Sequence, residues 1–246
     1  MMRHIEFARL HNFRDVGGYR TDDGRRVRWR RLYRSDSLHR LADDDLDRYH
    51  ALGIRTVIDL RHPDEVEFRG RAPHGPGYHN LPLEHRRWNV RDDYRPDAGI
   101  ARFFADRYRE VSQDGRAEIR SALEVIADAG NAPVVIHCAA GKDRTGVLTA
   151  LVLRLLGVAE EDVIADYALT GRATPRFLAY WEQEHPGEPP PWPGFGRAPA
   201  EAMRLFLAEL GPVRDYCLRT IGLDRLAISA LREHLLENPD IHQISG

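Results

Sequence analysis

The chain has 246 residues, enough for one well-filled hydrophobic core, and we expect a single domain over residues 1–246. Its formal net charge is -2, so no overall positive field favours nucleic acid or an anionic membrane. No run approaches the roughly 18 uncharged apolar residues of a membrane span, and the N-terminus has no apolar segment of signal-peptide length. These features predict a soluble, cytoplasmic protein and say nothing of its oligomeric state.

In chain order, residues 16–34 resemble a hairpin with its turn at Asp23-Gly24. Residues 41–52 have apolar side chains at helical spacing, and the β-branched run 54–60 predicts a buried strand. The following stretch, 61–99, is polar and interrupted by prolines, and we predict no helix or strand in it. The first third of the chain therefore predicts a hairpin, a helix and a strand.

The second part alternates between helix and strand. Residues 100–111 and 116–129 show helical apolar spacing, 133–138 is a short buried strand, and a further helix begins at Arg144 and ends at Gly157. Such alternation indicates an α/β fold.

The last part is predominantly helical in pattern. A helix over 160–171 could continue to 184, whereas 185–199 is too rich in proline and glycine for regular structure. Two or three more helices are predicted near 200–210, 212–221 and 223–237.

Two cysteines, Cys138 and Cys217, are too few for a disulfide framework, and neither has the spacing of a zinc site. Cys217 lies in an apolar helical pattern and is interpreted as structural. Cys138 instead precedes the small residues Ala139, Ala140 and Gly141, at the junction of the strand and the helix. The sequence therefore separates a packing cysteine from a candidate nucleophile.

A loop that enters a helix N-terminus presents free amides and a positive dipole end, which suits a phosphate or sulfate ion. Small residues allow the backbone to close around such an anion, and Arg144 can offer a planar fork to two phosphoryl oxygens. The same positive surroundings favour the thiolate form of Cys138, the reactive form of a cysteine.

The segment HCAAGKDRTG, 137–146, carries the pattern H-C-x5-R-[ST] and resembles the protein tyrosine phosphatase superfamily. NFRDVGG at 12–18 and LYRSDSLHRL at 32–41 resemble its bacterial branch, which includes dual- and triple-specificity enzymes. The resemblance extends from about residue 8 to the C-terminus and is weaker after 160. It implies a central, mostly parallel sheet flanked by helices, with a helical C-terminal part.

The resemblance also implies a phosphomonoester hydrolase that needs no metal or other cofactor. Cys138 would attack phosphorus and form a phosphocysteine, while Arg144 and the amides of the loop, Ala139 to Lys142, hold the phosphoryl oxygens. Thr145 would hydrogen-bond the sulfur, and His137 would orient the loop.

A proton donor is needed because an alkoxide or phenoxide leaves poorly. Many members of the superfamily supply an aspartate from a Trp-Pro-Asp loop upstream of the cysteine, and this chain has no such loop. The bacterial branch uses an aspartate inside the cysteine loop, which is Asp143 in this chain. Asp92, Asp93 and Asp97 are the alternatives.

Lys142 is the only lysine in the chain and lies four residues after Cys138. The resemblance suggests that it meets a second substrate phosphate, so that phosphoinositides join phosphorylated proteins as candidate substrates. It also suggests a helical lid within residues 160–215, with ordinary packing of the same helices as the alternative. A phospho-ligand-binding module with little turnover and a sulfurtransferase remain the competing functions.

Overall fold

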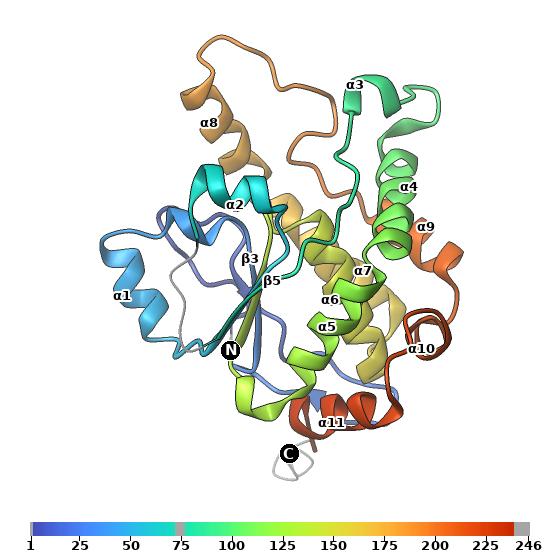
Figure 1. Cartoon of the computed structure of the whole chain (residues 1–246). Helices are drawn as coiled ribbons and strands as arrows, with labels where there is room; N and C mark the ends of the chain where they lie inside the picture. The colour runs from blue at the N-terminus through green and yellow to red at the C-terminus, as the bar shows by residue number, and fades with distance from the viewer. Residues whose placement is uncertain (1, 72–76, 239–246) are drawn as a thin grey trace, which may run out of the picture.

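The computed structural model describes residues 2–71 and 77–238 and is built around a five-stranded sheet (Figure 1). The strand order is β1-β3-β6-β4-β5, in which β1 is antiparallel to β3 and the other neighbours are parallel. The strands are β1 (Arg14–Asp15), β3 (Leu32–Ser35), β6 (Val134–His137), β4 (Thr56–Asp59) and β5 (Gly77–Asn80). The predicted α/β fold with a mostly parallel sheet is confirmed.

The register aligns the carboxyl ends of the four parallel strands. His137 at the end of β6 pairs with Ser35 of β3 and with Asp59 of β4, and Asp59 pairs with Asn80 of β5. The loops that follow these strands therefore leave the sheet at one edge, where ligand sites of parallel α/β sheets lie.

The two faces of the sheet enter different cores, because successive side chains of a strand point to opposite faces. Ile58 and Ile136 pack into the larger core with helices α4 (Gly99–Asp114), α5 (Arg116–Ala127) and α6 (Asp143–Leu156). Val57, Tyr33 and Val135 point to the other face and pack into a smaller core. This core also contains Phe13 and, from helix α1 (Asp44–His50), Tyr49.

The remaining elements complete this frame. The other helices are α2 (Pro63–Arg69), α3 (Val90–Asp93), α7 (Glu160–Ala168), α8 (Thr174–Glu184), α9 (Ala200–Leu210), α10 (Val213–Asp215) and α11 (Arg225–Leu235). Short 3-10 turns cover Leu38–Arg40, Ala129–Asn131 and Leu169–Ala173, and a π-helical turn covers Tyr216–Thr220. Within the described residues, no helix is long and apolar enough to cross a membrane.

The predicted hairpin over 16–34 is only partly present. The turn at Asp23-Gly24 forms, and the amide of Thr21 donates to the carbonyl of Arg25 at 3.0 Å. However, β2 (Arg26–Val27) pairs with β7 (Leu236–Glu237), and β3 is a buried strand of the main sheet. The hairpin pairing itself is present up to Val27, whose amide donates to the carbonyl of Tyr19 at 2.8 Å, and only the extension of the second arm to residue 34 is wrong, because β3 belongs to the main sheet.

The stretch 61–99 contains three elements that the pattern did not predict: α2, β5 and α3. Strand β5 reads Gly-Tyr-His-Asn and is half-buried, so it lacks the apolar run that marks an interior strand. Helix α6 has the predicted form, and Gly157 ends it in the left-handed conformation with φ 89°.

Candidate active site

Residues 138–142 form a loop between β6 and α6, and its carbonyl groups are held from outside. The Ala139 carbonyl accepts a hydrogen bond from Ser37 Oγ at 2.8 Å. The carbonyls of Ala140 and Gly141 both accept hydrogen bonds from Asn12 Nδ2, each at 3.0 Å. In a trans peptide the carbonyl and the next amide point in opposite directions. The amides of residues 140–142 therefore point away from these donors, as an anion-binding loop requires.

Gly141 fits this loop for two geometric reasons. Its φ of +62° lies in the left-handed region, which side chains disfavour. A Cβ at this position would also lie 2.4 Å from the carbonyl oxygen of Ser35. The loop thus packs its backbone directly against the end of β3.

A buried network of ion pairs among Arg14, Arg34 and Asp166 holds the backbone of the loop. Arg34 Nη2 donates to the Gly141 carbonyl at 2.8 Å, and Arg34 Nη1 lies 2.6 Å from Asp166 Oδ2. Arg14 contacts the same carboxylate at 3.3 Å and also donates to Asn12 Oδ1. Burial opposes ionisation of Asp166, but the two arginines hold the pKa of its carboxyl below the ordinary value.

Cys138 is 1% exposed and lies where three cationic side chains act on it electrostatically. These are Arg34, Lys142 and Arg144. Burial, followed by Arg14, lowers the pKa of Arg34 to about 10, while Asp166 and Cys138 oppose that change. The sulfur therefore lies among three cationic side chains.

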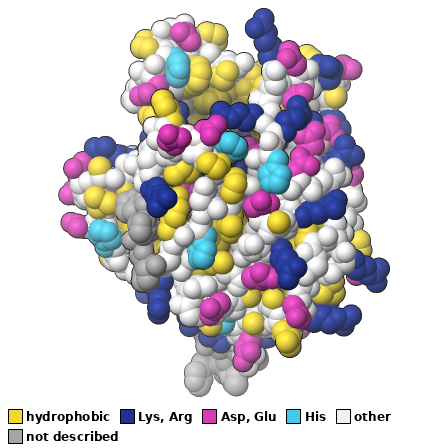
Figure 2. Space-filling view, in the orientation of Figure 1, with side chains coloured by type: hydrophobic (Ala, Val, Ile, Leu, Met, Phe, Trp, Pro, Cys, Tyr) yellow, Lys and Arg dark blue, Asp and Glu magenta, His cyan; other side chains and the backbone are white. Residues whose placement is uncertain are grey.

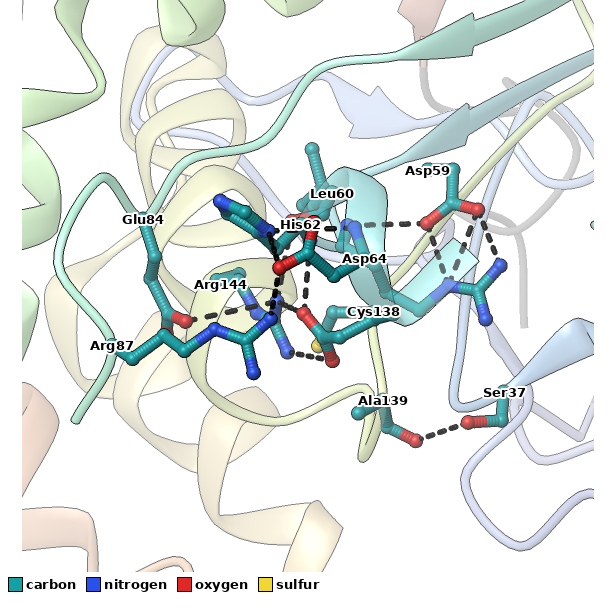
Figure 3. Close-up of polar contacts among 12 residues, drawn as sticks. Ser37, Asp59, Leu60, His62, Asp64, Glu84, Arg87, Cys138, Ala139 and Arg144 are labelled. Carbon is teal, nitrogen blue, oxygen red and sulfur yellow. Dashed lines mark hydrogen bonds and ion pairs between the residues drawn. The ribbon is translucent and has the colours of Figure 1, made fainter. Parts of the chain in front are cut away.

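Arg144 begins α6 together with Asp143 and is held by two carboxylates (Figure 3). Its Nη1 lies 2.5 Å from Glu65 Oε2 and its Nη2 lies 3.2 Å from Glu65 Oε1, a bidentate pair. Glu84 Oε2 lies 3.7 Å from Nη1. Burial alone lowers the pKa of Arg144, but Glu84, Cys138 and Glu65 together raise it above the ordinary value.

His137 is fully buried beneath the loop. Its Nε2 lies 3.4 Å from Asp59 Oδ2, and Asp59 forms a buried ion pair with Arg61 at 2.6 Å. His137 thus lies directly before the loop, and its expected orienting role stays a prediction. Thr145 is also buried, but its Oγ1 has no hydrogen-bond partner within the described residues, so the expected bond to the sulfur is not formed.

Asp143 is anchored by a tyrosine and a lysine. Its Oδ1 accepts a hydrogen bond from the Tyr108 hydroxyl at 2.7 Å and lies 3.4 Å from Lys142 Nζ. The Tyr108 and Tyr167 hydroxyls are 2.6 Å apart, and burial and the Asp143 charge raise the pKa of Tyr108.

The three alternative aspartates lie elsewhere. Asp93 is paired with Arg86 and Arg107 at 3.2 and 3.3 Å, whereas Asp92 and Asp97 are exposed. None of the three lines the cavities described below.

Lys142 faces the protein interior and is 5% exposed. Its ammonium lies 3.8 Å from the centre of the Phe104 ring and donates to the carbonyl of Arg197 at 3.0 Å. Burial lowers the pKa of this ammonium. The side chain thereby connects the cysteine loop to the proline- and glycine-rich segment 185–199.

A cleft of about 590 Å³ opens over the loop at Ala139 and Ala140. One wall comes from α2 and the other from α8, and Figure 2 shows hydrophobic side chains lining a hollow between these parts. The aromatic walls consist of Phe68, Phe177, Tyr180, Trp181 and Phe195, and the basic groups are Arg40, Arg69 and Arg87. A smaller cavity of about 280 Å³ adjoins Arg144 and is lined by His62, Glu65, Glu84, Arg87, Trp88, Asp143 and Arg144.

The region 160–215 divides into two parts. Helices α7 and α9 bury Val163, Ile164, Met203 and Phe206 in the larger core. Helix α8 and residues 185–199 instead stand at the edge of the molecule above α2 and carry part of the cleft wall (Figure 1).

The model of the tyrosine phosphatase family matches residues 5–237. The chain belongs to the tyrosine phosphatase family. This membership confirms the resemblance and the expected class of cysteine-dependent phosphatase. The phosphatase is 32% identical over 195 residues to the triple specificity protein phosphatase PtpB of Mycobacterium tuberculosis, covering 68% of this chain and 69% of that protein.

Other relatives have the same family name. A putative tyrosine-protein phosphatase of Cupriavidus necator is 33% identical over 186 residues, which cover 70% of the phosphatase and 65% of the relative, slightly less than two thirds. Among solved structures, P. aeruginosa TpbA is 20% identical with a TM-score of 0.37, covering 86% of this chain and 89% of that one.

Sequence reasoning missed most of the groups that hold the loop. Asn12, Arg14, Arg34 and Ser37 lie within the two N-terminal segments that carry the family resemblance, so a signal for them was present. Glu65 and Glu84 had no such signal, because they come from the polar stretch 61–99 that received no element.

Proposed function

We propose that this phosphatase hydrolyses phosphomonoesters through a phosphocysteine formed on Cys138. The observation that carries the proposal is the loop itself, with three successive carbonyls held outward and a buried thiol among three cations. Loop amides and Arg144 would hold the equatorial oxygens while the sulfur attacks phosphorus. Water then hydrolyses the intermediate, and Asp143 is the proton donor that the family resemblance suggests.

The cleft favours an aryl phosphate as substrate. Its walls carry five aromatic side chains above Ala139 and Ala140, and an aromatic ring buries well between such surfaces. We therefore propose phosphotyrosine in a protein as one substrate. We propose phosphoinositides as a second substrate class, because Arg40 and Arg69 line the same cleft and can contact further phosphates. The acidic side chains of this lining are Asp64, Glu65 and Glu184, and Asp64 pairs with Arg87 at 2.6 Å.

The first experiment measures hydrolysis of 4-nitrophenyl phosphate in the presence of a chelator by wild type, Cys138→Ser and Cys217→Ala. Cys138→Ser should lose turnover while still binding vanadate, because the hydroxyl is not ionised but the loop is intact. Cys217 is fully buried away from the cleft, so Cys217→Ala should keep activity.

Turnover by Cys138→Ser would refute the mechanism. Binding of phosphate with less than one product released per wild-type enzyme would indicate the binding module instead, and thiosulfate-dependent conversion of cyanide would indicate a sulfurtransferase.

A further inference from the structure

The side chain of Arg40 lies in the wall of the cleft, and its turn directly follows a residue that holds the cysteine loop. Ser37 donates from its hydroxyl to the Ala139 carbonyl at 2.8 Å, and the 3-10 turn Leu38–Arg40 begins at the next residue (Figure 3). Leu38 is fully buried in the smaller core and fixes this turn. The cleft of about 590 Å³ is lined by Ser37, by Arg40 and by the loop. Arg40 therefore lines the same space as the proposed phosphate site.

Three side chains hold the Arg40 guanidinium in one position. Its Nη2 donates to His11 Nε2 at 3.0 Å, and its Nη1 lies 3.9 Å from Asp36 Oδ2. Its central carbon lies 4.2 Å from the centre of the Tyr180 ring. Asp36 is fully buried and accepts the amides of His11 and Asn12 at 3.0 and 3.2 Å. Arg40 itself is 18% exposed, so it is anchored to the interior and still reaches the cleft.

Helix α8 keeps Tyr180 over Arg40, because the first turn of this helix is tied to the N-terminal segment. Arg176 donates to three backbone carbonyls of that segment, those of Phe7 at 2.9 Å, Ala8 at 2.6 Å and Leu10 at 2.9 Å. Arg176 and Tyr180 are four residues apart and so lie on the same side of the helix. Phe177, between them, is buried and meets the His11 ring edge-on, with the ring centres 5.5 Å apart.

The Arg40 guanidinium can still donate to an anion. A guanidinium has five N–H donors, and among the described residues one hydrogen bond, to His11, engages them. The contact to Asp36 at 3.9 Å is longer than a hydrogen bond. Burial, followed by the charges of Arg40 and Arg176, lowers the pKa of His11 to about 4, so this partner is neutral near neutral pH. The positive charge of Arg40 is therefore available to a ligand in the cleft.

The other cationic side chains near the cleft are held differently. Arg69 is exposed, and Arg87 is 65% exposed and paired with Asp64 at 2.6 Å. Lys142 lines a neighbouring cavity of about 200 Å³, where its ammonium donates to a backbone carbonyl. Binding through an exposed arginine costs the ordering of a long side chain, whereas Arg40 is already ordered.

The acidic lining of the cleft limits where further negative charge can bind. Asp64, Glu65 and Glu184 line it together with the arginines, and each repels an additional phosphate. A second phosphate is therefore stable only beside a cation that is held in place.

We infer that Arg40 binds a second phosphate on the inositol ring of the substrate and so makes the phosphatase prefer bisphosphates over monophosphates. The inference rests on the phosphoinositide hydrolysis proposed above. A volume of about 590 Å³ suits a small-molecule group, since such sites span about 300–1,000 Å³. Two phosphates on one ring have a short, fixed separation, which matches a fixed guanidinium in the turn beside the loop. Arg40 acts on affinity and takes no part in the making or breaking of bonds.

The test measures kcat and KM of wild type, Arg40→Gln and Arg9→Gln on short-chain phosphatidylinositol monophosphates and bisphosphates and on 4-nitrophenyl phosphate. Wild type should have a lower KM for bisphosphates than for monophosphates. Arg40→Gln should raise KM for bisphosphates about 10- to 100-fold more than KM for monophosphates, because a hydrogen bond between charged groups is lost. Arg9 is 54% exposed, is paired with Asp43 at 2.9 Å and does not line the cleft. Arg9→Gln removes the same charge and should keep the wild-type ratio of the two KM values.

Other outcomes separate the role of Arg40 from the proposed function. Equal KM values of wild type for the two lipid classes, or slowing of all three substrates by one factor in Arg40→Gln, would overturn the inference and leave the phosphatase function intact. So would a loss in Arg40→Gln that is confined to a doubly phosphorylated tyrosine peptide. Turnover of 4-nitrophenyl phosphate without turnover of either lipid would remove the phosphoinositide substrate, and no turnover at all would remove the phosphatase function.

A second variant keeps the inference testable if Arg40→Gln does not fold. Tyr180→Leu removes the ring that holds the guanidinium and leaves the charge of Arg40 in place. It should reduce the preference for bisphosphates severalfold, because Arg40 must then be ordered when the ligand binds. An unchanged ratio of the two KM values in Tyr180→Leu would contradict the role of a pre-positioned Arg40.

Discussion

The side-chain amide of Asn12 lies 3.0 Å from the carbonyl oxygen of Gly141, although 129 positions separate them in the chain. The same nitrogen donates to the preceding carbonyl of Ala140 at 3.0 Å. One residue of the N-terminal segment thus fixes two peptide planes of the cysteine loop. The loop owes its shape to partners outside it as much as to its own small residues.

Gly141→Ala should abolish activity because the added Cβ would meet the backbone of β3, which has little room to move. We expect a loss of at least about 100-fold in kcat/KM, together with weaker vanadate binding. Gly53→Ala is the matched control, since Gly53 has a similar φ of +64° with no atom within 4 Å of the new Cβ. It should cost about 1–2 kcal/mol of stability and leave kcat/KM unchanged. Equal activity of the two variants would contradict the packing argument.

Asp166→Asn should destabilise the fold strongly, because it leaves Arg14 and Arg34 buried without their shared counter-charge. Breaking a buried pair by removing one partner costs about 3–5 kcal/mol. Glu124→Gln removes an ion pair of 2.8 Å whose partners are 48% and 44% exposed, and it should cost less than about 1 kcal/mol. Urea unfolding of both variants measures the two losses in the free energy of unfolding. Losses of similar size would contradict the claim that the buried network stabilises the fold more than an exposed ion pair.

Lys142→Met should loosen the segment 185–199, because the ammonium holds the Arg197 carbonyl and packs on the Phe104 ring. A hydrogen bond to a charged group is worth about 1.5–3 kcal/mol, so limited proteolysis within the segment should accelerate by roughly tenfold or more. Arg197→Ala retains the backbone carbonyl and should keep the wild-type rate of cleavage. A Lys142→Met variant that loses only activity toward substrates with two phosphates would instead support the role predicted from the resemblance.

Glu84 should make the free energy of unfolding depend on pH, whatever its role in catalysis. Its pKa is about 7 in the folded protein against 4.5 for an ordinary glutamate, so the folded state binds more protons between these values. Wild-type stability is therefore lost as the pH rises from about 4.5 to about 7, and Glu84→Gln should lack this loss. The variant should gain, relative to wild type, on the order of 2 kcal/mol by pH 8 in urea unfolding. Parallel stability curves for the two proteins would contradict the raised pKa.

The strand, loop and helix around Cys138 were predictable because their signals are local. A β-branched run, a cluster of small residues and an apolar helical period follow one another within residues 134–157, and Gly157 ends the helix as its position indicates. The short strand β5 was not predictable, because its four residues have no apolar pattern. The pairing of β2 with β7 was not predictable either, because nothing in two short segments far apart in the chain indicates that they pair.

The sequence by itself identified the family and predicted Cys138 as the nucleophile with Arg144 as its partner, since a fixed spacing of a few residues around a tight turn is a local property. Only the tertiary structure decided which groups surround them. The parallel sheet brings the ends of β3, β4, β5 and β6 to one edge, so that Ser37, Glu65 and Glu84 meet the loop from distant parts of the chain. Burial and neighbouring charge then set the protonation of each carboxyl group, and these depend on packing that no short stretch of sequence contains.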